Sequence, residues 1–127
     1  STVAERFEHL RIGLNRRGYL GLSDCDIQIA RYPGDGTGYD RHLDAFAGDA
    51  NRRVTSIVYL NCDWQPSHGG KLRLYPDDSQ TLDIEPLAGR LVTFFSDELE
   101  HGVLPSFSPR FAVTSWYRGA APFRVAI

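Results

Sequence analysis

His42 and Asp44 stand two residues apart in the segment 39–44, which reads YDRHLD. On an extended strand, residues i and i+2 point to the same face, so we expect an imidazole and a carboxylate to project side by side. Imidazole nitrogens suit divalent iron, and a carboxylate adds a charged oxygen ligand. Two histidines and one carboxylate on one face, with the remaining positions open, form the facial triad of non-haem Fe(II) oxygenases. The pair therefore predicts two of the three protein ligands of such a site.

The third ligand must come from elsewhere in the chain, and His101 is the best candidate. Arg110 follows it and opens a strand-like run that ends at Tyr117. A cosubstrate dicarboxylate needs a cation for its carboxylate far from the metal, and the planar guanidinium offers two donors that fit this group. A single His is more often a surface or hydrogen-bonded residue than a ligand. The four positions in this order, each at the edge of a strand-like run, favour a metal site.

Length and composition are those of an ordinary globular chain. The 127 residues favour one domain, 1–127, and 42% of them are hydrophobic, which is enough to form a core. The net charge of -2 gives no sign of binding to nucleic acid or to an anionic membrane, and the apolar runs are too short to span a bilayer. Cys25 and Cys62 form neither a metal-binding pair nor a disulfide framework. We interpret them as reduced thiols in or near the core, which predicts a cytoplasmic protein.

Hydrophobic periodicity predicts one helix followed by about eight short strands. Apolar residues recur at spacings of four, three and four from Val3 to Leu14, which indicates a helix that ends near Gly18 and packs on a sheet. The period then changes to two, and strands are expected over 26–32, 39–44, 54–60, 71–75, 82–84, 90–95, 101–104 and 110–117, with 123–127 as a further edge. This all-β core with an N-terminal helix indicates a sandwich or barrel, and jelly rolls and cupins hold metals between their sheets.

The alternation of side chains along two strands predicts a pocket. If Arg110 points into the barrel, Thr114 and Trp116 share its face, and a pure core would seldom contain the Arg. Tyr59 shares a face with Thr55 on an earlier strand. Tyr59 could offer its hydroxyl group to the carboxylate that Arg110 binds, or it could be a core ring with its hydroxyl at the rim. The alternation alone leaves both interpretations open.

Several motifs together carry a specific resemblance. In chain order they are YPGDGTGYDRHLD at 32–44, YLNCDW at 59–64, GGKLRLYP at 69–76, DIEP at 83–86, FFSD at 94–97 and RFAVTSWY at 110–117. Over roughly residues 28 to 118 the chain resembles the prolyl hydroxylases that act on hypoxia-inducible factor and their bacterial relatives, which are 2-oxoglutarate- and Fe(II)-dependent oxygenases. Collagen-type prolyl hydroxylases usually have a Lys where this chain has Phe111, which argues against that branch.

The resemblance implies a double-stranded β-helix, a jelly-roll or cupin-like fold. It also implies a dioxygenase that hydroxylates prolyl residues of a protein or peptide substrate with dioxygen, releases succinate and CO2, and uses Fe(2+), 2-oxoglutarate and, as a reductant, ascorbate. By position, the iron ligands would be His42, Asp44 and His101, and the distal carboxylate of 2-oxoglutarate would be bound by Arg110 and Tyr59. The residues expected to line the pocket are Tyr32, Ile57, Leu72, Val103, Thr114 and Trp116.

Three alternatives remain open on the sequence. The same chemistry could act on a different side chain or on a small molecule. The chain could be a β-sandwich that binds a metal or ligand without turnover. It could also be a cupin-like metal enzyme that does not use 2-oxoglutarate, in which case His68 would have to join the ligands. His68 lies in a loop rich in Pro, Ser and Gly, so we expect it to be solvated.

Overall fold

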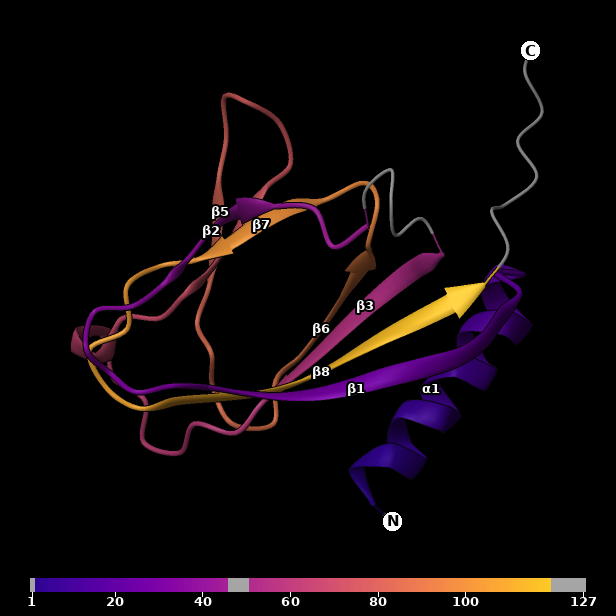
Figure 1. Cartoon of the computed structure of the whole chain (residues 1–127), viewed down its shortest axis with the longest axis horizontal. Helices are drawn as coiled ribbons and strands as arrows, with labels where there is room; N and C mark the ends of the chain where they lie inside the picture. Colours follow the sequence, from indigo (N-terminus) through magenta and orange to yellow (C-terminus); the bar gives the residue numbers. More distant parts are fainter. Residues whose placement is uncertain (1, 46–50, 120–127) are drawn as a thin grey trace.

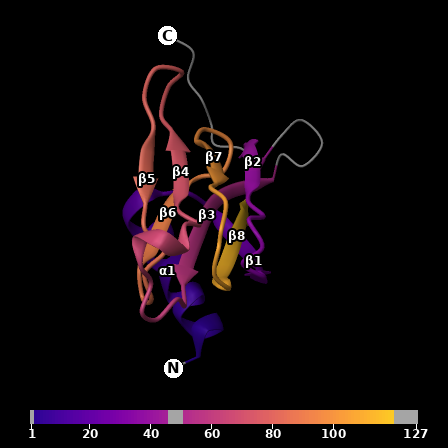
Figure 2. The same ribbon diagram turned by 90° about the vertical axis from the view of Figure 1, so that its left-hand side faces the viewer.

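Two four-stranded antiparallel sheets face each other, and one helix covers the outside of the longer sheet (Figures 1 and 2). The computed structural model describes residues 2–45 and 51–119. The sheet with the longer strands, sheet A, has the order β1-β8-β3-β6, and the other, sheet B, has the order β2-β7-β4-β5. The strands of sheet A are β1 (Leu22–Tyr32), β8 (Arg110–Gly119), β3 (Arg52–Tyr59) and β6 (Leu91–Phe95). Those of sheet B are β2 (Tyr39–His42), β7 (Glu100–Val103), β4 (Leu72–Tyr75) and β5 (Leu82–Ile84).

The predicted helix is confirmed as α1 (Val3–Gly18). It begins with a capping box, in which Thr2 accepts a hydrogen bond from the backbone of Glu5 and the Glu5 side chain accepts one from the backbone of Thr2. Its C-cap is Tyr19, which has a left-handed backbone conformation and donates its backbone N–H to the carbonyl oxygen of Asn15 in the last turn. Phe7 is buried on the side that faces sheet A, whereas His9 is exposed, as its position off the apolar stripe predicts.

Sheet A is covered on both faces over part of its length, by α1 on the outside and by sheet B on the inside. Because side chains alternate along a strand, β3 and β8 each contribute residues to both sides. On β8, Val113 and Tyr117 point outward and pack with Phe7 under α1. The alternate residues Ala112, Thr114 and Trp116 point inward, toward sheet B. There, Ile57 and Tyr59 of sheet A pack with a second cluster that is completed by Leu72, Leu74, Phe94 and Ala112. The core of the protein is therefore two layers deep, one under the helix and one between the sheets.

The strands differ from the expectations mainly at their ends. β1 begins at Leu22 rather than Asp26, and β2 ends at His42, so Asp44 lies beyond the strand. The region 62–70 contains a 3-10 turn, η1 (Pro66–His68). The edge strand expected over 123–127 lies outside the described residues. The prediction that both thiols lie in or near the core is wrong for Cys62, which is exposed, while Cys25 is half-buried.

The helices described here include none that is both long and apolar enough to cross a lipid bilayer.

Candidate metal centre and adjoining pocket

The pairing of two short strands brings His42 and His101 together. β2 and β7 are antiparallel neighbours, and His42 stands directly opposite His101, with the ring centroids 4.3 Å apart. The Nδ1 atom of His42 lies 2.7 Å from the carbonyl oxygen of Asp40, and that of His101 lies 3.1 Å from the carbonyl oxygen of Leu99. Donation of each Nδ1–H to its carbonyl fixes the ring and leaves Nε2 available as a ligand atom. Both imidazoles are therefore oriented by backbone carbonyls.

Asp44 completes the cluster, although it does not lie on the strand that the i, i+2 argument assumed. β2 has ended, and the chain turns so that Asp44 Oδ1 lies 3.2 Å from the Nε2 atoms of both histidines. The three ligand atoms all lie within 4.8 Å of one another. Metal bonds of about 2.1 Å at right angles would separate such atoms by about 3 Å. Spacing and ligand types therefore fit a divalent iron site of the two-histidine, one-carboxylate kind.

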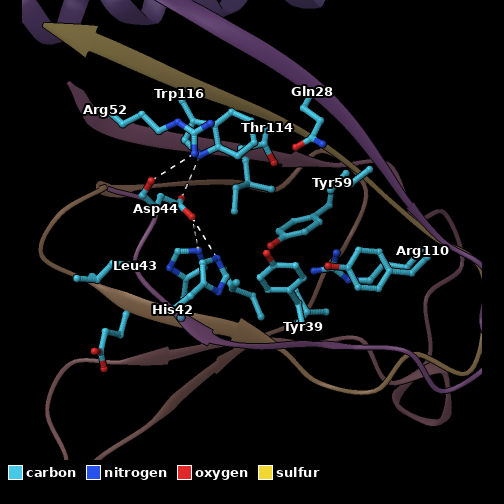
Figure 3. A pocket seen from close by; sticks show the side chains of 18 residues that line it. Gln28, Tyr39, His42, Leu43, Asp44, Arg52, Tyr59, Arg110, Thr114 and Trp116 are labelled. Carbon is cyan, nitrogen blue, oxygen red and sulfur yellow. Dashed lines mark hydrogen bonds and ion pairs between the residues drawn. The ribbon is translucent and has the colours of Figure 1, made fainter. Parts of the chain in front are cut away.

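The second carboxylate oxygen of Asp44 is bound by sheet A. Asp44 Oδ2 accepts a hydrogen bond of 2.7 Å from the Thr55 hydroxyl and one of 3.2 Å from the Trp116 indole N–H. Thr55 on β3 stands opposite Trp116 on β8, so the register of sheet A places both donors side by side. Figure 3 shows Asp44 between Trp116 on one side and His42 on the other. The carboxylate thus connects the two sheets.

Electrostatics keep this carboxylate ionised. Burial raises the pKa of Asp44, but hydrogen bonds with His101, His42 and Thr55 outweigh it and hold the pKa well below its usual range. The hydrogen bond to Asp44 raises the pKa of His42 above its ordinary value. The cluster therefore presents an anionic oxygen between two imidazole nitrogens, which is an arrangement that attracts a cation.

A pocket of about 710 Å³ extends from the cluster to Arg110 (Figure 3). Arg110 is 5% exposed, and its Nε donates a hydrogen bond of 2.7 Å to the carbonyl oxygen of Gly70. Gly70 has a φ of 72°, and a Cβ atom there would lie 2.9 Å from the Arg110 side chain, so a glycine permits this close approach. Within the described part of the chain, Arg110 forms no ion pair with a carboxylate. A buried guanidinium without an anion is a binding site for one.

Two tyrosines flank this cation. The guanidinium carbon lies 5.1 Å from the ring centroids of both Tyr32 and Tyr59. The buried Tyr59 hydroxyl has no hydrogen-bond partner among the described residues. Burial raises the pKa of both phenols despite the opposing charge of Arg110, so both stay protonated at neutral pH. Tyr59 thus has a free donor beside the guanidinium, which favours the first of the two interpretations that the alternation left open.

The structure brings all the predicted site residues to one pocket. The six residues expected to line it do so: Tyr32, Ile57, Leu72, Val103, Thr114 and Trp116. His68 lies in η1, and its Nδ1 atom accepts a hydrogen bond from the backbone N–H of Gln65. Among the described residues, the one group of three or more candidate metal ligands does not include His68, which disfavours the cupin alternative.

Sequence reasoning missed several residues of the site. Gln28, Tyr39 and Arg52 also line the pocket, and Ser96 lies behind Thr55, with 2.8 Å between their hydroxyl oxygens. The shared face of Thr55 and Tyr59 was a signal that Thr55 points inward. Nothing in the sequence indicated that Ser96 would lie behind it, because that contact joins the residue after β6 to the middle of β3, far away in the chain.

Comparison with known families gives a match over most of the chain. Residues 27–118 match the model of the 2OG-Fe(II) oxygenase superfamily. Over 92 residues the chain is 47% identical to the human prolyl hydroxylase EGLN3 and 49% identical to a hypoxia-inducible factor prolyl hydroxylase of Caenorhabditis elegans. Each match covers 70% of this chain, but only 38% and 13% of those relatives. The chain thus spans well under half the length of these curated relatives.

Solved structures give the same result for the fold. A prolyl-4-hydroxylase of Pseudomonas putida superposes with a TM-score of 0.84 at 42% identity, covering 93% of this chain and 65% of that protein. A prolyl hydroxylase from Trichoplax adhaerens, solved in complex with a peptide fragment of the hypoxia-inducible factor oxygen degradation domain, has a TM-score of 0.84 at 35% identity. That match covers 92% of this chain and 55% of the other.

Proposed function

This chain belongs to the 2OG-Fe(II) oxygenase superfamily, and from that premise we propose that it is a dioxygenase that hydroxylates prolyl residues of a protein substrate. The family implies the cofactors Fe(2+) and 2-oxoglutarate. The observation that carries the proposal is the convergence of His42, Asp44 and His101 at one end of a pocket whose other end holds Arg110. A metal site and a dicarboxylate site in one cavity are what the chemistry requires.

We also propose that the fold is a double-stranded β-helix. Two facing antiparallel sheets with candidate site residues on both are consistent with a double-stranded β-helix, the jelly-roll fold that the sequence predicts. We assign residues 1–127 to a single catalytic domain, because the family match spans 27–118 and α1 packs against the same sheet through Phe7.

The residues present would hold both cofactors. His42, Asp44 and His101 would bind the iron through two Nε2 atoms and one carboxylate oxygen, and Arg110 with Tyr59 would bind the far carboxylate of 2-oxoglutarate. When bound, iron and 2-oxoglutarate supply the activation of dioxygen, with succinate and CO2 as by-products. Ascorbate as a reductant remains a prediction.

The pocket walls have two tasks. Ile57, Leu72 and Val103 line the cavity with apolar surface, which would pack against the methylene groups of 2-oxoglutarate and exclude water. Thr114 and Trp116 line the same cavity from β8. A dry pocket strengthens the attraction between Arg110 and a carboxylate, because the local dielectric constant is low.

Prolyl hydroxylation is the favoured activity because relatives that are 35–49% identical to this chain carry that name. The Trichoplax protein was solved with a peptide fragment of the hypoxia-inducible factor oxygen degradation domain, which supports a peptide rather than a small molecule as substrate here. Hydroxylation of another side chain is the second candidate, since the family match by itself does not fix the substrate.

The test is incubation of the protein with Fe(II), 2-oxoglutarate and oxygen, together with proline-containing peptides or with free amino acids. We expect succinate formation, and mass spectrometry should show the gain of one oxygen atom on a prolyl residue. Oxygenation of a different residue or of a free amino acid would move the assignment to the second candidate. Binding of metal and 2-oxoglutarate without any oxygen uptake would indicate a non-catalytic binding protein.

A further inference from the structure

On the basis of the function proposed above, we propose that Thr55, held by Ser96, is a positioning residue that restricts Asp44 to metal binding through a single oxygen. Asp44 Oδ1 faces the two histidines, whereas Oδ2 faces sheet A. The positions that a second carboxylate oxygen would otherwise occupy on the metal then stay open for 2-oxoglutarate and dioxygen.

The direction of the hydrogen bonds follows from counting protons. An ionised carboxylate only accepts, so the single proton of the Thr55 hydroxyl goes to Asp44 Oδ2, at 2.7 Å. The Ser96 hydroxyl, 2.8 Å from Thr55 Oγ1, must therefore donate its own proton to Thr55. Thr55 and Ser96 are both fully buried, so water does not compete for these bonds. The result is a directed chain of donors from Ser96 through Thr55 to the carboxylate.

Ser96 also fixes the backbone beside Asp44. Its carbonyl oxygen accepts a hydrogen bond of 3.1 Å from the N–H of Ala45, and its own N–H donates to the carbonyl oxygen of Arg53 at 3.0 Å. Asp44 lies past the end of β2 and therefore lacks the support of a strand ladder. Ser96 therefore supports Asp44 in place of strand hydrogen bonds. It is connected to the Asp44 carboxylate through Thr55, and it bonds directly to the backbone of the next residue.

These hydrogen bonds decide which oxygen of Asp44 can bind a metal. Thr55 and the Trp116 indole N–H both donate to Oδ2, which leaves Oδ1 as the oxygen free to bind a cation. Without the Thr55 hydroxyl, the carboxylate can rotate or bind through both oxygens, and it then competes with 2-oxoglutarate for the open positions. Loss of the hydroxyl should therefore weaken 2-oxoglutarate binding, although Thr55 is not among the residues proposed to touch 2-oxoglutarate.

The test measures binding of 2-oxoglutarate to the Mn(II)-loaded protein by calorimetry, without turnover. Thr55→Val keeps the shape and removes the hydroxyl. Loss of a hydrogen-bond partner of a metal ligand usually costs about 10-fold to 100-fold in metal affinity or activity, and we expect the affinity for 2-oxoglutarate to fall by a similar factor. Thr55→Ser keeps the hydroxyl and should bind like the wild type. Visible absorption of the Co(II)-loaded protein should change in Thr55→Val and not in Thr55→Ser. Equal affinities for Thr55→Val and the wild type, or equal weakening in Thr55→Ser, would overturn the proposal.

A matched pair of variants covers the case in which Thr55→Val does not fold. Ser96→Ala removes the donor behind Thr55, and Ser56→Ala removes an equally buried hydroxyl that instead bonds to Thr93 on the opposite face of sheet A. We expect Ser96→Ala to weaken 2-oxoglutarate binding and Ser56→Ala to leave it unchanged, and equal behaviour of the two would contradict the role of Ser96. If the wild-type protein itself binds neither Mn(II) nor 2-oxoglutarate, it is the proposed function that fails.

Discussion

The two sheets contribute to the candidate site in different ways. Sheet B supplies His42 and His101 through the register of two four-residue strands, so a backbone ladder determines where the imidazoles lie. Sheet A supplies Arg110 and Tyr59 from the inward faces of long strands and binds Asp44 through side chains. The histidines are thus placed by the backbone, and the carboxylate by hydrogen bonds that cross from one sheet to the other.

The sheets also differ in what supports them. Sheet A is packed on its outer face by α1, through a cluster that includes Phe7, Val113 and Tyr117. In sheet B, the strands β2 and β5 contain no buried residue. A metal bound by His42, His101 and Asp44 would therefore tie the less supported sheet to the better supported one. The comparison predicts that metal binding matters for the stability of sheet B as well as for chemistry.

The largest expected effect follows from removing the residue that connects the sheets. Asp44→Ala removes the one anionic ligand, and His101→Ala removes a buried imidazole from the same cluster. We expect no detectable succinate from either variant, measured with Fe(II) and 2-oxoglutarate in excess. Ser56→Ala, a buried change on the outer side of sheet A, serves as the folded control. Normal turnover by either ligand variant would remove the metal centre from this position.

Arg110→Ala tests the part of the site that belongs to sheet A alone. Loss of one partner of a buried charge pair costs about 3–5 kcal/mol, so the affinity for 2-oxoglutarate should fall by at least two orders of magnitude. Calorimetric titration of the Mn(II)-loaded variant measures this. Arg31→Ala is the matched control, because Arg31 is exposed and its guanidinium lies over Phe111 rather than in the pocket. An unchanged affinity in Arg110→Ala would place the carboxylate site elsewhere.

Hydrogen exchange tests whether a metal joins the sheets. At a metal concentration 100 times the dissociation constant, binding stabilises the folded state by about 2.7 kcal/mol. We expect the added protection to be larger for amides of β2 and β7 than for those of β1 and β8, since local opening of sheet B breaks the site. Exchange with and without Mn(II), read by mass spectrometry, provides the comparison. Equal protection in both sheets would mean that sheet B does not open on its own.

Much of this site could be predicted from the sequence because strand alternation is a strong local signal. The inward face that contains Arg110, Thr114 and Trp116 follows from counting residues along β8, and the structure confirms it. The convergence of His42 and Asp44 was also predicted, from the rule that residues i and i+2 of a strand share a face, but this rule applies here only in part. The strand ends between them, and contacts with sheet A determine the position of Asp44.

The contacts that the sequence did not reveal are those between segments far apart in the chain. The bond from Ser96 to Thr55 joins the residue after β6 to the middle of β3, and no local periodicity carries that information. The exposed position of Cys62 was missed for a different reason: cysteine is usually buried, but Cys62 lies in a turn after β3. Residue types, spacing and the resemblance to known enzymes indicated the candidate ligands, whereas the packing that orients them required the fold.

The smallest expected effect concerns an ion pair of sheet B. Arg73 on β4 stands opposite Asp83 on β5 and donates two hydrogen bonds to its carboxylate, of 2.8 and 2.9 Å. The side chains are 34% and 28% exposed, so water and salt screen the pair, and a double-mutant cycle with Arg73→Ala and Asp83→Ala should give a coupling of only about 0.2–1 kcal/mol in the free energy of unfolding. In contrast, Phe7→Ala, which removes a buried ring under sheet A, should cost about 3–5 kcal/mol.

The pH dependence of that coupling has a definite sign. The hydrogen bonds from Arg73 lower the pKa of Asp83, so the coupling is present above the ordinary Asp pKa of about 3.9 and is lost as the pH falls through the lowered value. Salt should also reduce it, because exposed charges are screened. Denaturant unfolding of the four proteins of the cycle, at two pH values and two salt concentrations, measures all of these effects. A coupling well above 1 kcal/mol would show that an ion pair stabilises sheet B more than its exposed strands suggest. A bound metal would then add less to the stability of that sheet.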